Sequence, residues 1–132
     1  MLKKDATAII LEMFEEYDVK HEILDDDLFR FTVSGHNLKH IPIIIVCRYD
    51  SIEVHCSNIV TVNKNYDKVL EFLNSLNSEH RWYKFCIDED GELICSADSF
   101  VNNETKVVLY YLIFNMAKII DEMYPKLIKI MW

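Results

Sequence analysis

The chain has 132 residues, 51% of them hydrophobic and 27% charged, and its 14 Lys and Arg against 22 Asp and Glu give a net charge of -8. A chain of this length buries one proper core without disulfides or metals, so we expect a single domain over residues 1–132. Only two glycines and two prolines are present, which excludes phosphate loops, dinucleotide fingerprints and the nucleophile elbow. The negative charge disfavours binding to nucleic acids and to anionic membrane surfaces.

The N-terminal segment and the longest apolar run predict neither export nor membrane insertion. Acidic residues interrupt the apolar stretch behind Lys3 and Lys4, and no small-residue cleavage site follows. The longest apolar run, residues 107–114, is far shorter than the roughly 18 to 20 residues that a bilayer requires. We therefore expect a cytoplasmic protein whose four cysteines are free thiols.

The first half of the chain predicts one helix followed by a run of antiparallel strands. Apolar residues at three- and four-residue spacings predict an amphipathic helix over residues 6–17. A short strand is expected at residues 21–24, and strict alternation predicts strands at 29–33 and 52–56. Residues 41–47 are apolar on both faces, which indicates a strand covered on both sides, with Pro42 tolerated near its start.

The second half predicts a helix, a hairpin and a long final helix. Asn65 starts the first of these helices, and its apolar positions extend to Leu76. Two strands follow at residues 82–88 and 92–99. The final helix is expected over about residues 104–123, with Asn103 at its start and Pro125 as its stop, followed by a short amphipathic tail.

The hairpin at residues 88–92 can be closed by a two-residue turn or by a three-residue loop, and the choice decides which side chains share a face. The two-residue turn would pair Cys86 with Cys95 and place Asp98 on the aromatic core surface. Because burying an unpartnered carboxylate is costly, we predict the three-residue loop with Gly91 in a left-handed conformation. Cys86 and Cys95 then lie on opposite faces and form neither a disulfide nor a shared metal site. This register pairs Ile87 with Leu93, Phe85 with Cys95 and Tyr83 with Ala97.

The cysteines and histidines do not form a recognisable chemical motif. Structural zinc sites use cysteines two to four residues apart on tight turns, whereas all four cysteines here fall inside predicted strands. Cys47 and Cys56 are the candidate nucleophiles of a Cys–His enzyme, but a thiol buried in apolar surroundings is inert. The acidic turn at residues 25–27 indicates solvated carboxylates, with a weak divalent-cation site as the alternative. We expect no catalytic residue, no cofactor and no metal.

The final helix has only a narrow polar stripe and needs cover on two sides. Either the first helix and the C-terminal tail supply the second cover, or a second copy of the chain does. The outer face of the hairpin adds a modest apolar patch within a polar frame, although its tryptophan could instead pack under a loop. The candidate surface for a partner or a second subunit comprises Trp82, Cys86, Ile94, Tyr111 and Trp132.

The middle helix closes with residues 73–77, the hairpin carries Phe85, Ile87, Asp88, Asp90, Gly91 and Leu93, and residues 124–127 follow the last helix. In these residues and in its element order, the chain resembles the YbjN family, described as bacterial sensory-transduction regulators, and that family is similar in fold to type III secretion chaperones. The resemblance implies an α+β fold with an antiparallel sheet of five or six strands, in the order α-β-β-β(-β)-α-β-β-α. It also implies a small intracellular protein, often dimeric, that binds other proteins and has no inherited catalytic residue.

These observations lead to one main hypothesis and two alternatives. The main hypothesis is a non-enzymatic, homodimeric regulatory or chaperone-like protein that accepts an amphipathic segment, either as an added strand or as a helix in a groove. The first alternative is an acidic immunity or inhibitor protein that binds a basic enzyme through residues 25–27 and 88–92. The second alternative is a thiol enzyme.

Overall fold

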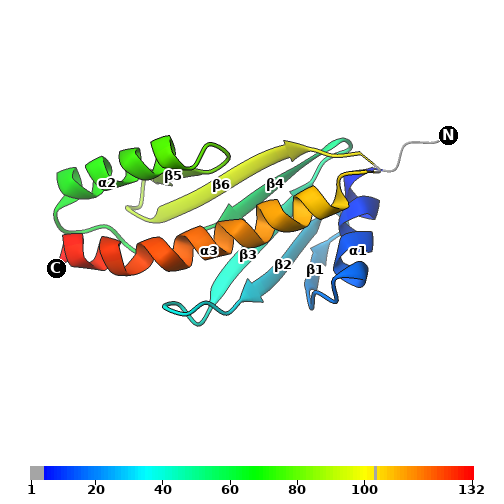
Figure 1. The fold of residues 1–132 in the computed structure, drawn as a ribbon, viewed down its shortest axis with the longest axis horizontal. Helices are drawn as coiled ribbons and strands as arrows, with labels where there is room; N and C mark the ends of the chain where they lie inside the picture. Colours follow the sequence, from blue (N-terminus) through cyan, green and yellow to red (C-terminus); the bar gives the residue numbers. More distant parts are fainter. Residues whose placement is uncertain (1–4, 103) are drawn as a thin grey trace.

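The computed structural model describes residues 5–102 and 104–132. It contains three helices and a six-stranded antiparallel sheet with the strand order β1-β2-β3-β4-β6-β5 (Figure 1). The α+β fold, the antiparallel sheet and the element order that the sequence predicted are thereby confirmed. The elements are α1 (Ala6–Glu16), β1 (Glu22–Asp25), β2 (Leu28–Val33), β3 (Ile41–Cys47), β4 (Ser51–Cys56), α2 (Tyr66–Glu79), β5 (Lys84–Ile87), β6 (Leu93–Phe100) and α3 (Lys106–Met131).

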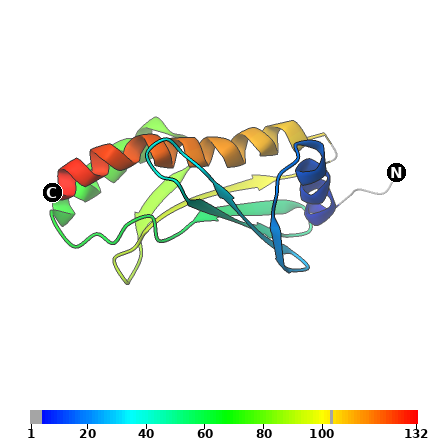
Figure 2. The same ribbon diagram turned by 90° about the horizontal axis from the view of Figure 1, so that it is seen from below.

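The long helix α3 lies across one face of the sheet, with α1 packed near one of its ends and α2 near the other (Figures 1 and 2). The core forms between this sheet face and the three helices, and apolar side chains from every element except β1 contribute to it. No helix in the described part of the chain covers the opposite face of the sheet (Figure 2). One-sided cover explains why β2 and β4 alternate between buried and partly exposed residues.

The expectation that β3 is covered on both faces is wrong. Ile41, Ile43 and Ile45 are buried against the helices, whereas Pro42 is exposed and Ile44 is half-buried on the open face. The strand lies inside the sheet, between β2 and β4, but no helix of the described residues covers its second face (Figure 2). Its apolar composition on both sides therefore leaves hydrophobic surface on the outer face of the sheet.

The hairpin of β5 and β6 adopts the predicted register in its closed part. Phe85 pairs with Cys95, and Gly91 has the left-handed conformation, with a φ of 82°. Cys86 is exposed and Cys95 is buried, which confirms that these two thiols lie on opposite faces. The predicted pair of Tyr83 and Ala97 is not part of the ladder, which ends at Lys84 and Ser96.

The final helix does not stop at Pro125, contrary to the sequence-based prediction. It continues to Met131, so the residues predicted to form a separate tail are its last turns. Proline lacks the N–H that would bond to the carbonyl of Asp121, four residues earlier. The side-chain amide of Asn37 donates to that carbonyl instead, at 3.0 Å. This bond satisfies the carbonyl and removes one reason for the helix to end at the proline.

The helix starts are only partly as predicted. Asp5 caps α1 by accepting a bond from the backbone N–H of Ala8 at 2.9 Å. Asn65 precedes α2 as expected, but its backbone is left-handed and its side chain makes no cap bond. Its amide instead donates to the carbonyl of Ile130 at 2.9 Å, which connects the start of α2 to the end of α3. The predicted cap residue Asn103 lies outside the described residues.

Candidate functional site

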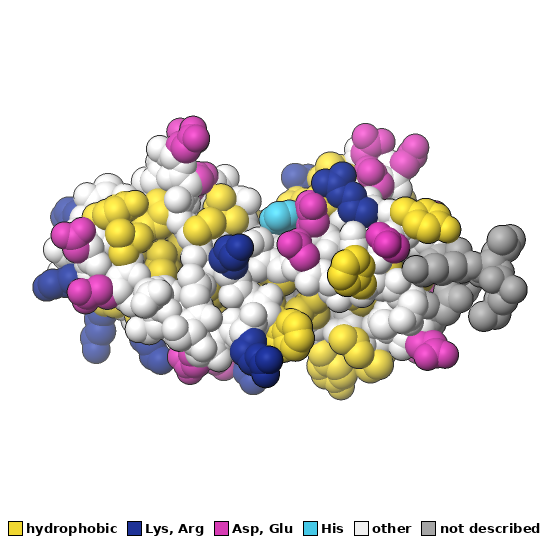
Figure 3. Space-filling model, turned by 90° about the horizontal axis from the view of Figure 1, so that it is seen from above, with side chains coloured by type: hydrophobic (Ala, Val, Ile, Leu, Met, Phe, Trp, Pro, Cys, Tyr) yellow, Lys and Arg dark blue, Asp and Glu magenta, His cyan; other side chains and the backbone are white. Residues whose placement is uncertain are grey.

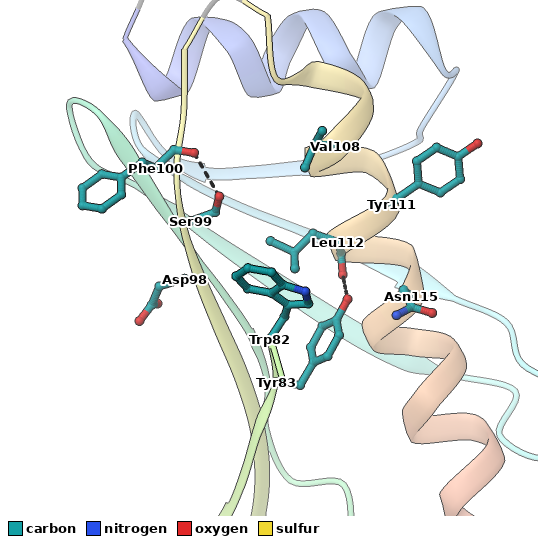
Figure 4. A pocket seen from close by; sticks show the side chains of 9 residues that line it. All are labelled: Trp82, Tyr83, Asp98, Ser99, Phe100, Val108, Tyr111, Leu112 and Asn115. Atoms are coloured by element: carbon teal, nitrogen blue, oxygen red, sulfur yellow. Dashed lines mark hydrogen bonds between the residues drawn. The ribbon is translucent and has the colours of Figure 1, made fainter. Parts of the chain in front are cut away.

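A surface groove of about 620 Å³ lies between the C-terminal half of β6 and the N-terminal half of α3 (Figure 4). Its volume falls in the range typical of binding sites, and most of its wall is apolar. Among the described residues of its lining, Asp98 alone is charged. The lining residues are Trp82, Tyr83, Asp98, Ser99, Phe100, Val108, Tyr111, Leu112 and Asn115.

A buried tyrosine fixes the two walls of the groove to each other. The hydroxyl of Tyr83, just before β5, donates to the carbonyl of Leu112 in α3 at 2.6 Å (Figure 4). Burial raises the pKa of this hydroxyl, so it stays protonated and remains a donor at neutral pH. The bond therefore sets the distance between the helix and the sheet at the floor of the groove.

Large hydrophobic side chains around the groove are exposed to solvent. The exposed fraction is 70% for Trp82, 81% for Phe100, 66% for Tyr111 and 58% for Val108. Figure 3 shows several exposed hydrophobic side chains close together on this face of the molecule, in the half away from α2. Clustered exposed aromatic residues around an apolar groove are typical of interaction sites, whereas single ones are ordinary.

The groove lies beside a free edge of the sheet. β6 extends to Phe100, but β5 pairs with it only as far as Lys84 and Ser96, so the stretch Ala97–Phe100 has β4 on one side and no described strand on the other. The outer edge of β5, by contrast, is closed by Asn77 of α2. Its side chain accepts from the N–H of Phe85 at 2.7 Å and donates to the carbonyl of Phe85 at 3.0 Å.

The structure divides the predicted partner surface into three separate places. Trp82 and Tyr111 both line the groove, so Trp82 is not on the outer sheet face where the sequence placed it. Cys86 and Ile94 face each other across β5 and β6 on the open face of the sheet. Trp132 follows the last turn of α3, where the ammonium of Lys64 lies 3.9 Å from the centre of its ring.

Sequence reasoning missed several lining residues of the groove, chiefly Ser99, Phe100, Val108 and Leu112. The predicted strand ends at residue 99, although Phe100 continues the alternation of β6. The sequence pattern assigns Val108 and Leu112 only to a helix surface that needs cover. No local pattern shows that β5 is shorter than β6, and this difference in length is what leaves the edge open.

Three of the four thiols are buried in the core. Burial raises the pKa of the Cys47 thiol to about 11 and that of the Cys56 thiol to about 12, and it also raises the pKa of Cys95. A thiol with so high a pKa carries almost no thiolate at neutral pH and is a poor nucleophile. This geometry counts against the two cysteines that the sequence nominated for catalysis. Cys86 is exposed.

The acidic turns have structural roles in part. Oδ1 of Asp88 accepts from the N–H groups of Asp90 and Glu92, both at 2.9 Å, and so organises the β5–β6 loop. Asp25 does the same for the N–H of Asp26 at 2.8 Å. Among the described residues, no three His, Cys, Asp or Glu side chains come together as a metal site would require. Docking of a basic enzyme on these turns remains a prediction.

Within residues 5–102 and 104–132, no helix is both long and apolar enough to cross a bilayer.

Comparison with known proteins agrees with this architecture. A chain of the heterodimeric complex ExoU-SpcU, from the type III secretion system of Pseudomonas aeruginosa, superimposes with a TM-score of 0.63 at 12% identity. The match covers 91% of this chain and 95% of that chain. At this identity the likeness shows the fold alone, and it confirms the type III secretion chaperone-like fold expected from the sequence. A search of curated proteins finds no match.

Fold and groove together define an α+β protein with a type III secretion chaperone-like fold and an exposed apolar groove. A family model, described as "Putative bacterial sensory transduction regulator", matches residues 7–129. The chain belongs to this family, YbjN, as its hairpin and helix-end residues indicated.

Proposed function

We propose that this protein is a non-enzymatic, chaperone-like binding protein that holds a segment of a partner polypeptide in the groove between β6 and α3. The observation that carries the proposal is the cluster of exposed Trp82, Phe100 and Tyr111 around an apolar groove beside a free sheet edge. Burying such aromatic side chains supplies much of the binding free energy in protein complexes. Of the five residues that the sequence predicted for the partner surface, the proposal keeps Trp82 and Tyr111 as residues of the groove.

The relatives support a protein partner and a regulatory role. The structural neighbour was determined as a heterodimeric complex, and the family is described as a regulator of sensory transduction. The proposal extends to this chain the idea that the fold presents a surface to a second, different polypeptide. It further places the protein in the cytoplasm, where its four unpaired thiols would stay reduced.

The proposal also includes a homodimer that forms through the open face of the sheet. This face carries the half-buried Ile44, Val46 and Ile94 beside the exposed Cys86, and no described helix covers it. A second copy packed there would bury apolar surface and leave the groove free for the partner. Sedimentation or light scattering should give twice the monomer mass. Ile94→Glu should shift the mass to that of the monomer, whereas Leu70→Glu, at an exposed apolar position of α2, should leave it unchanged.

Site-specific photo-crosslinking in the native host tests the binding proposal. A photoreactive amino acid replaces Phe100 or Tyr111 at the groove, and Tyr66, which is 49% exposed at the start of α2, serves as the matched control. We expect both groove positions to capture the same polypeptide and Tyr66 to capture none of it. Binding of the purified polypeptide should then weaken with Trp82→Ala. Capture of nothing, or equal capture from all three positions, would refute the proposal.

A further inference from the structure

We propose that the groove takes an extended segment of the partner, which pairs as a short added strand with the free edge of β6 and alternates apolar with basic side chains. This inference rests on the proposed function and names the conformation and the chemistry of the segment. The stretch available for pairing is Ala97–Phe100, directly beyond the point where β5 leaves the ladder.

The direction of the backbone groups follows from the contacts of Asn77. Because both backbone groups of Phe85 point away from β6 to Asn77, those of Lys84 and Cys86 point toward β6. The same alternation along β6 directs the N–H and C=O of Ser96 toward β5 and those of Asp98 and Phe100 toward the free edge. The next residue, Val101, agrees with this alternation, because its N–H donates to the carbonyl of Asp50 on the β4 side at 2.8 Å.

The free edge therefore offers the hydrogen bonds that an added strand needs. The carbonyl of Phe100 accepts one bond from the hydroxyl of Ser99 at 2.9 Å and has a second lone pair to offer. The N–H groups of Asp98 and Phe100 and the carbonyl of Asp98 face the same side. A helix laid in the groove would leave these groups without partners, whereas an extended segment satisfies them, and this difference favours the strand.

The side chains on the two faces of β6 predict the pattern of the segment. Successive residues of an added strand point alternately to the two sides of the sheet. On the α3 side they meet the groove wall of Trp82, Val108 and Leu112, which favours aliphatic or aromatic residues (Figure 4). On the open side they lie beside Asp98 and Phe100, a carboxylate and a ring that together suit an arginine or lysine.

Charge favours a basic partner over a second copy of this chain. Asp98 lies directly across from Glu53 of β4, so two carboxylates share one cross-strand position. Glu53 forms an ion pair with Arg48 at 3.3 Å and contacts Nε2 of His55 at 3.5 Å. Within the described residues, the carboxylate of Asp98 has no ion pair or hydrogen bond. Pairing the same edge of two copies would bring further carboxylates into this short ladder, in a chain that already carries a charge of -8.

The other free edge of the sheet is less suited to the role. β1 is exposed along its whole length, and its register with β2 shifts between Ile23 and Asp25. Such irregular, charged edge strands resist the addition of another strand. β1 contributes no residue to the lining of the groove between β6 and α3, so a segment added there would not reach Trp82, Val108 or Leu112.

The test uses the full chain and a fluorescein-labelled peptide in which three arginines alternate with two isoleucines. A permuted peptide groups the arginines at one end, and a third peptide replaces them with glutamate. Fluorescence anisotropy should show the alternating peptide bound at least about tenfold more tightly than the permuted one, because only alternation separates the two side-chain sets. Equal affinities for the alternating and permuted peptides would show that net charge alone attracts the peptide, and they would overturn the inference.

Backbone methylation of the peptide tests strand pairing without altering the protein. One peptide is N-methylated at its arginines and another at its isoleucines, so each loses the N–H groups of one edge. We expect one of the two to lose at least about tenfold in affinity and the other to bind almost as before. The arginine set is the sensitive one if the strands are antiparallel. Loss in both peptides, or in neither, contradicts pairing with β6.

Protein variants locate the site. Trp82→Ala should lower the affinity for the alternating peptide by at least about tenfold. Asp98→Lys should lower that affinity by up to about fivefold and should raise the affinity for the glutamate peptide. Tyr66→Ala and Asp26→Lys are the matched controls, since they remove an exposed ring at the start of α2 and an exposed carboxylate in the β1–β2 turn. Equal effects of the variants and their controls would place the peptide elsewhere.

The two proposals fail in different ways. If no alternating peptide binds while photo-crosslinks from Phe100 and Tyr111 still recover one partner, the strand inference is wrong and the proposed function stands. If the peptide binds with the expected methylation pattern while the crosslinks recover no other protein, the groove has the inferred chemistry and the proposed function is wrong.

Discussion

Gly35 lies directly against the carboxylate of Asp121, so that a Cβ at position 35 would overlap with its Oδ1 and Cγ atoms. The close approach lets the loop between β2 and β3 wrap around this carboxylate, which is buried on α3. Three consecutive backbone amides donate to it, those of His36 at 2.9 Å and of Asn37 and Leu38 at 2.8 Å. The carboxylate thus attaches the middle of the long helix to the sheet.

Replacing Asp121 with asparagine should lower the free energy of unfolding by about 2–4 kcal/mol. An asparagine keeps one acceptor but presents an NH₂ group to the remaining backbone N–H, and the bonds that survive lose their charge. Urea unfolding followed by circular dichroism measures the change. Glu122→Gln, the exposed neighbour on the same helix, is the control and should stay within about 0.5 kcal/mol of the wild type.

The same carboxylate should make stability depend on pH in the acid range. Burial raises the pKa of Asp121, but the backbone amides of Leu38, His36 and Asn37 outweigh it and hold the pKa below its ordinary value of 3.8. A lowered pKa contributes stability that is fully present above the unfolded value and is lost as the pH falls through the folded value. Urea midpoints should therefore fall more steeply below about pH 4 for the wild type than for Asp121→Asn. Parallel curves would refute this.

Asn37 and Pro125 should be coupled in a double-mutant cycle. Asn37→Ala removes the bond to the carbonyl of Asp121 and should cost about 1–2 kcal/mol, because no backbone N–H can replace it. In Pro125→Ala the helix supplies its own N–H to that carbonyl, so Asn37→Ala should cost less in this background. Equal costs in both backgrounds, measured by urea unfolding, would show that the amide does not compensate for the proline.

Asn77 should protect the edge of β5. Asn77→Ala leaves the N–H and carbonyl of Phe85 without their protein partners, and we expect a loss of about 1–3 kcal/mol in unfolding free energy. The newly open edge should also promote aggregation on concentration, which light scattering detects. Asn74→Ala, at an exposed position of the same helix, is the control. Similar behaviour of the two variants would assign the loss to helix propensity.

One thiol should react with a thiol-specific disulfide reagent in the native protein, and four after unfolding. Cys86 is exposed, whereas burial holds the pKa of Cys47, Cys56 and Cys95 high. Because the thiolate is the reactive form, the three buried thiols should stay protected at neutral pH. Cys86→Ser should abolish the native reaction. A fast reaction that survives this substitution would revive the thiol-enzyme hypothesis.

Much of the fold could be predicted because a helix or strand that is buried on one side has apolar residues at a regular spacing in the sequence. The alternation in β2, β4 and β6 and the helical spacing of α1 each reflect a single covered face. The hairpin register followed from Asp98, since one register would have buried it. The same reasoning misjudged β3, where both faces are apolar although the helices in the described part of the chain cover one of them.

The errors arose where a distant side chain decides local structure. Pro125 has the local signature of a helix end, and the hydrogen bond that compensates for it comes from Asn37, far away in the chain. Trp82 continues the spacing of β5, but the strand begins only at Lys84, which turns the ring toward α3. The sequence therefore predicted two residues of the candidate site, Trp82 and Tyr111, but it did not predict the groove. The groove depends on where β5 ends, which no local pattern shows.

The attachment of α3 at Asp121 acts together with the bond from Tyr83 to Leu112, nine residues earlier on the same helix. A helix fastened at two points separated by more than two turns neither rolls nor slides over the sheet. The mouth of the groove should then be as wide in the isolated protein as in a complex. Most of the conformational entropy lost on binding would then be lost by the incoming chain. A stiffened or cyclised ligand should therefore bind more tightly, whereas stiffening this protein should not raise the affinity.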